Sequence, residues 1–155
     1  MQPVQRLARL PEELIIPARE LEQQIAGETA EFAHDLGLQW SAWHQDSPVW
    51  YVWRDDQEGD TTLSKSVQVG VYVTREATPF VRAVGLATVR NEHTLEAVVP
   101  EKPFFSKSKP VADLHGNREV YALVRSTWEA LAKVKQQDVK GRTIKLPPRP
   151  ANWPS

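Results

Sequence analysis

The segment from residue 65 to residue 90 constrains the fold of this chain more than any other. Between Val67 and Thr74 apolar and polar residues alternate strictly, which is the pattern of a strand with one buried face. From Phe80 to Arg90 the chain is apolar and β-branched on both faces, and residues 75–79 between the two runs are polar and short. The segment therefore predicts a long antiparallel hairpin in the middle of a sheet.

Two glycines, Gly70 and Gly85, lie inside the predicted strands. Glycine within a strand usually marks a bulge, a bend or a close approach to the backbone. We therefore expect the hairpin, and the sheet around it, to be curved.

The chain before this hairpin predicts a helix. Pro11 and the acidic residues after it are typical of a helix start, and Pro17 is expected to end or kink that first turn. From Ala18 to Leu36 an apolar stripe predicts the main helix, with Gly37 as its C-terminal cap.

Three further segments complete the predicted sheet. Residues 38–43 and 48–55 are aromatic and apolar and predict two strands, followed by an acidic loop over residues 55–60. Residues 94–99 predict either a fifth strand or the tail of the fourth.

The C-terminal third reads differently. Its residues 100–116 contain three prolines and a serine and lysine cluster, which indicates an irregular connection. Asn117 is a plausible N-cap for a second helix that runs to about Gln137. Residues 138–146 could add an edge strand, and residues 147–155 form a proline-rich tail.

The fold class that follows is α+β. We expect a curved antiparallel sheet of four to five strands in a meander, with an N-terminal and a C-terminal helix on one face. Residues 12–146 form the single domain, after a flexible segment over residues 1–11. Such a sheet can enclose a small-molecule pocket or present a flat adaptor surface, and the sequence leaves both open.

Composition and charge limit the function classes. The chain has no cysteine, so disulfides, thiolate metal sites and a cysteine nucleophile are excluded. The first 17 residues contain no apolar run long enough for a signal sequence or a membrane span, so a cytoplasmic protein is the default expectation. Residues 12–60 carry a net charge of −10 and residues 102–149 a net charge of +7. The two halves either form binding faces or neutralise each other in the fold.

Motifs for catalysis or metal binding are missing. The four histidines lack metal-ligand spacing, and there is no phosphate-binding loop or GxSxG motif. The acidic residues 55–60 lack the carboxylate spacing of an EF-hand. The best catalytic candidate is His44 with Asp46, since a carboxylate can orient an imidazole base, although such loop residues more often form turns. We expect no metal and no cofactor.

Aromatic residues are the strongest functional signal. Six tryptophans are present, of which Trp50 and Trp128 fit core positions. Tryptophan is favoured at binding hot spots, so the candidate binding residues are Trp40, Trp43, Tyr51, Trp53, Phe104 and Phe105. Phe104 and Phe105 lie beside three lysines, and they either close the core like a lid or stack on single-stranded nucleic acid. The net charge of −1 disfavours binding to nucleic acid.

These observations favour a non-enzymatic protein-binding module, an adaptor, inhibitor or chaperone-like protein. It would use the exposed aromatic residues and the acidic N-terminal half to bind another protein. The alternative is a domain that binds an apolar small molecule, or a small enzyme, with a tryptophan-lined pocket between sheet and helix. A homodimer is compatible with either hypothesis.

Overall fold

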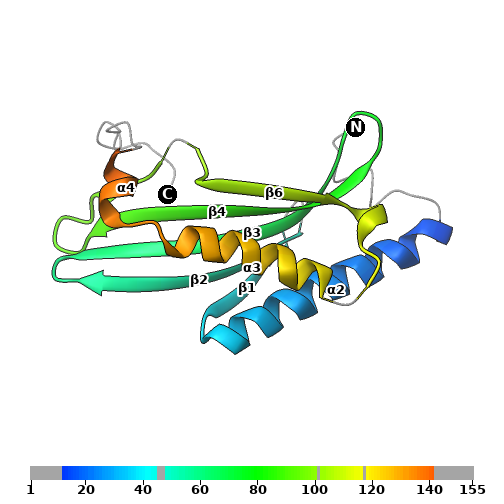
Figure 1. The fold of residues 1–155 in the computed structure, drawn as a ribbon, viewed down its shortest axis with the longest axis horizontal. Coiled ribbons are helices and arrows are strands. Elements are labelled where there is room, and N and C mark those ends of the chain that lie inside the picture. Colours follow the sequence, from blue (N-terminus) through cyan, green and yellow to red (C-terminus); the bar gives the residue numbers. More distant parts are fainter. Residues whose placement is uncertain (1–11, 45–47, 101, 117, 142–155) are drawn as a thin grey trace.

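The computed structural model describes residues 12–44, 48–100, 102–116 and 118–141, without the side chains of residues 12–18 and of His44. The elements within these ranges follow one another as helix, strands and helices (Figure 1). They are α2 (Glu12–Leu36), β1 (Gln39–His44), β2 (Pro48–Glu58), β3 (Thr61–Val73), β4 (Pro79–Asn91), β5 (Ala97–Val98), β6 (Phe105–Pro110), the 3-10 turn η1 (Val111–Asp113), α3 (Glu119–Ala132) and α4 (Gln136–Gly141).

The described strands form one antiparallel sheet. Strands β1 to β4 follow one another as a meander, and β5 and β6 both pair with the outer edge of β4. The predicted hairpin is confirmed as the centre of this sheet, because β3 and β4 pair without interruption from Thr61 opposite Asn91 to Val73 opposite Pro79. The α+β fold and the meander order are therefore as the sequence predicted.

Strand β6 was not predicted, and the expectation of an irregular segment over residues 100–116 is wrong for residues 105–110. The strand pairs with β4 from Phe105 opposite Gly85 to Pro110 opposite Phe80. Its helix-facing side chains include Lys107 and Lys109, which reach Ser126 and Glu119 of α3. A strand whose inward positions are lysines shows no apolar alternation, so the sequence pattern did not reveal it.

The acidic loop predicted over residues 55–60 is wrong for residues 55–58, because β2 continues to Glu58, and only residues 59–60 form a turn. Residues 55–58 each pair with β3, and Glu58 lies opposite Thr61. Arg54 and Asp56 form an ion pair along the strand. Gly59 then makes the tight turn with a φ of 58°. Ladder pairing with the central hairpin outweighs the low strand preference of acidic residues here.

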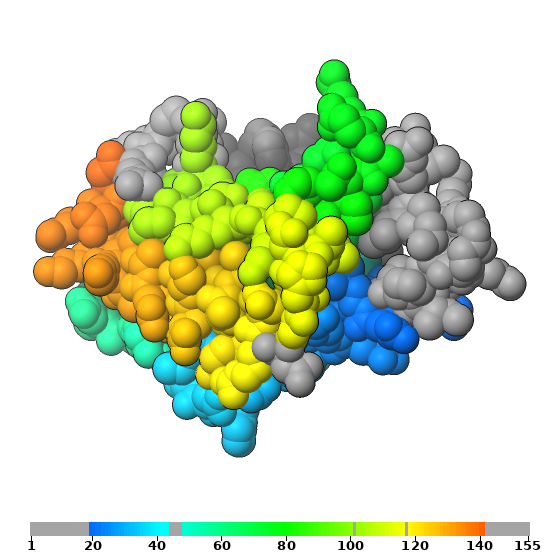
Figure 2. All heavy atoms as spheres, turned by 45° about the vertical axis from the view of Figure 1, so that its right-hand side comes forward, coloured from blue at the N-terminus to red at the C-terminus, as the bar shows by residue number. Residues whose placement is uncertain are grey.

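Both long helices pack on the same face of the sheet. Helix α2 lies over β1 and β2, whereas α3 lies over β3, β4 and β6, and the two helices contact each other (Figure 1). Figure 2 shows them side by side, with α2 in blue to cyan and α3 in yellow to orange. The core lies between the helices and the sheet, where the alternating valines of β3 are buried against residues such as Ile25, Phe32 and Leu131.

Helix α2 passes through Pro17, so the expectation that the helix ends there is wrong, whereas the alternative of a kink stays a prediction. A proline removes a single backbone hydrogen bond, and packing of the rest of the helix on the sheet maintains it. The predicted cap at Gly37 is confirmed. Its φ is 66°, and the N–H groups of Gly37 and Leu38 donate to the carbonyls of His34 and Ala33. This pair of bonds is the Schellman motif.

The C-terminal helices differ from the prediction. Helix α3 ends at Ala132, and the edge strand expected over residues 138–146 is wrong for residues 138–141, which belong to the short helix α4; residues 142–146 lie outside the described residues. The carboxylate of Asp138 accepts a hydrogen bond from the Lys135 N–H at 2.8 Å, which caps this turn, and Val139 is fully buried. The predicted cap Asn117 and the proline-rich tail over residues 147–155 lie outside the described residues.

Candidate functional site

The side of the sheet that faces away from the helices carries a group of aromatic and apolar side chains. Because side chains alternate along a strand, the neighbours of the buried Trp50, Val52 and Val69 point to this other side. No helix in the described part of the chain packs on it. We call this surface the open face and define it by Trp43, Val49, Tyr51, Trp53, Gly70, Tyr72, Phe80, Val84 and Leu86.

Two aromatic pairs lie on the open face. The rings of Tyr51 and Trp53 on β2 have centroids 5.7 Å apart with a tilt of 49°. The rings of Tyr72 on β3 and Phe80 on β4 are stacked, with centroids 5.3 Å apart and 15° between their planes. Trp43, at the β1 edge, is 52% exposed. The pairs hold these rings in fixed orientations, so they offer a preformed contact surface.

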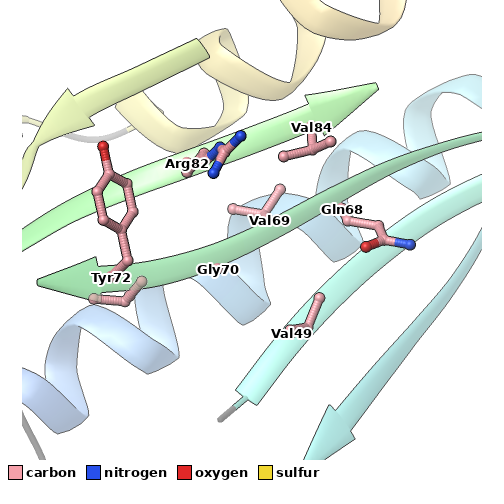
Figure 3. A pocket seen from close by; sticks show the side chains of 8 residues that line it. Val49, Gln68, Val69, Gly70, Tyr72, Arg82 and Val84 are labelled. Atoms are coloured by element: carbon pink, nitrogen blue, oxygen red, sulfur yellow. The ribbon is translucent and has the colours of Figure 1, made fainter. Parts of the chain in front are cut away.

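A shallow hollow of about 180 Å³ lies on the open face above Gly70. Val49, Tyr72, Arg82 and Val84 surround it, and Gln68 lies at its rim (Figure 3). A typical small-molecule pocket has at least about 300 Å³ and encloses its ligand. The hollow therefore has the size of one large side chain rather than that of a cofactor or drug-sized ligand.

Arg82 provides the charge beside the hollow. Its Nε donates to the hydroxyl of Ser106 on β6 at 2.9 Å, and the neighbouring Tyr72 hydroxyl is 3.3 Å from that of Ser108. No carboxylate of the described residues forms an ion pair with Arg82. Arg90, farther along the same strand, pairs with Glu92. The terminal nitrogens of Arg82 are thus the positive charge that the open face presents to a partner.

The predicted binding residues separate into two groups. Trp43, Tyr51 and Trp53 come together on the open face. Trp40 lies on the helix side, where its indole N–H donates to the Thr29 hydroxyl at 2.8 Å. Phe104 is only 8% exposed and belongs to the core, and Phe105 packs against it. The last two therefore close the core as a lid, which was one of their two expected roles.

The remaining predictions about tryptophan and histidine have different outcomes. Trp50 and Trp128 are 2% and 5% exposed, which confirms them as core residues. The backbone of His44 ends β1, but its side chain and Asp46 lie outside what the structure describes. Among the described residues, no group of three or more His, Asp or Glu side chains is placed to hold a metal ion.

Sequence reasoning missed Tyr72, Phe80, Arg82 and the hollow at Gly70. The alternation of residues 67–74 already placed Gly70 and Tyr72 on the face opposite the buried valines. The missing information was the register of β3 against β4, which puts Phe80 opposite Tyr72 and Arg82 opposite Gly70.

The acidic N-terminal half is partly neutralised within the fold. Arg118 at the start of α3 reaches Glu31 and Asp35 of α2 at 3.2 and 3.9 Å. The Glu28 carboxylate accepts hydrogen bonds from two backbone N–H groups of α3. These three carboxylates therefore act between the two helices.

No helix in the described ranges combines the length and the apolar character needed to cross a membrane. Comparison with protein-family models, with curated proteins and with solved structures found no match for this chain.

Proposed function

We propose that this protein is a non-enzymatic protein-binding module that holds its partner on the open face of the sheet. One observation carries the proposal: an aromatic sheet face lies opposite the helix layer, and no described element packs on it. Contiguous apolar surface of this kind usually marks an interaction site, because leaving it in water is unfavourable.

The chemistry of the face supports a protein as the partner. Tyrosine and tryptophan are enriched at interface hot spots, since they bury large areas at a small cost in side-chain entropy. The serines of β3 and β6 that border the aromatic residues resemble the polar rim of an interface. The acidic charges of α2 that remain exposed, such as Glu20 and Glu22, would favour the approach of a basic partner.

The proposal is tested by replacing Trp43 or Trp53 with alanine. Each variant should lose about 2 kcal/mol or more of binding free energy, which is about a 30-fold loss of affinity. The exposed Trp43 should contribute little to stability. Partner capture from the protein's own source lysate, read by native mass spectrometry, measures binding, and urea unfolding measures stability.

The control is Trp40→Phe, which alters a partly exposed tryptophan on the helix side. It removes the hydrogen bond to Thr29 and should reduce stability by about 1 kcal/mol without affecting capture. Equal losses of capture and stability in the Trp43 and Trp53 variants would make them structural residues and would contradict the proposal. A small added mass on the wild-type protein, with no second polypeptide, would favour the small-molecule alternative.

A further inference from the structure

Gly70 has no structural explanation within the described fold. It lies in the interior of β3, opposite Val49 on one side and Arg82 on the other, in a ladder that continues without a bulge. Its φ is not positive, unlike that of Gly37 and Gly59. Glycine destabilises a strand relative to alanine, because it loses more backbone freedom on folding.

Space does not require glycine at this position either. A Cβ atom on Gly70 would lie 3.8 Å from the Pro48 carbonyl oxygen and 3.9 Å from Val49 Cγ2, which are ordinary contacts. The other strand glycine, Gly85, is different, because its Cβ would lie only 3.2 Å from Thr127 Cγ2 of α3. Close packing of the helix explains Gly85, whereas Gly70 keeps a hollow open on the opposite side of the sheet.

The surroundings of the hollow define what it can receive. Val49, Val84 and the Tyr72 ring form apolar walls, so the occupant is an apolar side chain (Figure 3). Arg82 at the rim has no described carboxylate partner, and a guanidinium group favours a carboxylate, which it can bind through two nitrogens. The hollow is too shallow to enclose a free small molecule, whereas a protein segment would also cover the aromatic pairs around it.

We propose that the hollow above Gly70 receives an apolar side chain of a protein partner, and that a neighbouring carboxylate of the same partner pairs with Arg82. This inference rests on the proposed function and specifies the partner's docking segment. A second copy of this chain fits less well. In a symmetric pairing that brings the two hollows together, each Arg82 would meet the residues that line the other hollow, and these include no carboxylate. Asp55, on the same side of β2, lies farther along the strand, beyond Trp53.

The test uses the ¹⁵N-labelled full-length protein and three blocked dipeptides as probes. These are the amides of N-acetyl-Phe-Asp, N-acetyl-Phe-Asn and N-acetyl-Phe-Lys, titrated while the backbone amide signals are recorded by NMR. The aspartate peptide should shift the signals of Gly70 and Arg82. It should bind about two- to fivefold more tightly than the asparagine peptide, as expected for an exposed ion pair.

Two variants separate the apolar part from the charge. Gly70→Val fills the hollow and should abolish the shifts with every peptide. Gly70→Ala fills less of the hollow, and its Cβ atom fits at ordinary contact distances from Pro48 and Val49. Arg82→Gln should make the aspartate and asparagine peptides bind equally. The control is Gly27→Ala on α2, where a Cβ meets nothing within 4 Å, and which should leave every titration unchanged.

Several results would overturn the inference. They are equal affinity of the wild-type protein for the aspartate and asparagine peptides, unchanged binding by Gly70→Val, or no shift at the hollow at the highest soluble peptide concentration. Concentration-dependent shifts of the same signals without peptide would assign the hollow to a second copy instead. If partner capture requires Trp43 and Trp53 but is unaffected by Gly70→Val and Arg82→Gln, the inference fails while the proposed function stands.

Discussion

Glu28 on α2 caps the start of α3, and its removal should be among the most destabilising single changes in this protein. The residue preceding α3, Arg118, has a left-handed backbone and no capping side-chain hydrogen bond. The Glu28 Oε1 atom accepts hydrogen bonds instead from the backbone N–H groups of Val120 and Tyr121, both at 3.1 Å. These are the two groups that an N-cap side chain normally satisfies.

The size of the effect follows from the two donors. Glu28→Ala leaves both N–H groups without an acceptor, and Val120 is fully buried. An unsatisfied buried donor costs about 1–3 kcal/mol, and the loss of a helix cap costs about 0.5–2 kcal/mol. We therefore expect the free energy of unfolding to fall by about 2–4 kcal/mol, a large fraction of the roughly 5–15 kcal/mol typical of a domain.

Urea unfolding followed by tryptophan fluorescence measures the change. Glu28→Gln keeps an oxygen acceptor but loses the charge at the positive end of the helix, so its loss should be smaller, about 0.3–1 kcal/mol. Glu20→Ala, on the exposed side of α2, should stay within about 0.5 kcal/mol of the wild type. If Glu28→Ala and Glu20→Ala unfold at the same urea concentration, the carboxylate does not cap α3 and the reasoning is refuted.

Two further predictions concern the dependence of stability on pH. Burial first, and then repulsion from Arg54, hold the pKa of Lys65 below its ordinary value, with Asp56 acting in the opposite direction. The folded protein therefore releases the Lys65 proton at a lower pH than the unfolded chain does. Between the pKa of the folded protein and that of the unfolded chain, the free energy of unfolding should rise with pH because of this residue. Lys65→Met should remove that rise, as measured by urea unfolding at several alkaline pH values. An unchanged rise in the variant would contradict this assignment. Hydrogen bonds from Thr62 first, and then from Arg90, lower the pKa of Glu92. The stabilisation by ionised Glu92 is therefore fully present above the pKa of the unfolded chain and is lost as the pH falls through the lowered pKa of the folded protein. Glu92→Gln should be less stable than the wild type at neutral pH and should lose less stability in acid. If the stabilities of the variant and the wild type fall in parallel as the pH is lowered, this assignment is wrong.

The sequence alone was sufficient for the central part of the fold. Alternation over residues 67–74 identified both the strand and its buried face, because a period of two in hydrophobicity records directly which side of a strand is covered. Gly37 marked the end of α2 for an equally local reason, since its positive φ favours glycine. The tryptophans on the open face were recognised as binding candidates by residue type alone.

Elements stabilised by other parts of the chain were not recognisable locally. Strand β6 has lysines at its helix-facing positions, and these make sense only when Glu119 and Ser126 of α3 lie beside them. The acidic end of β2 is a strand because β3 provides its hydrogen-bonding partners. In both segments tertiary pairing outweighed intrinsic preference.

The sequence by itself determined which residues form the helix, the central hairpin and most of the core, because periodicity and caps depend on near neighbours. The tertiary structure alone decided which surfaces meet. It brought the aromatic residues of β1 to β4 together on the open face, it placed Arg82 opposite Gly70, and it brought Glu28 to the start of α3, 92 residues away. The physical reason is that side-chain patterns record burial, whereas register and layer order depend on contacts between segments far apart in the chain.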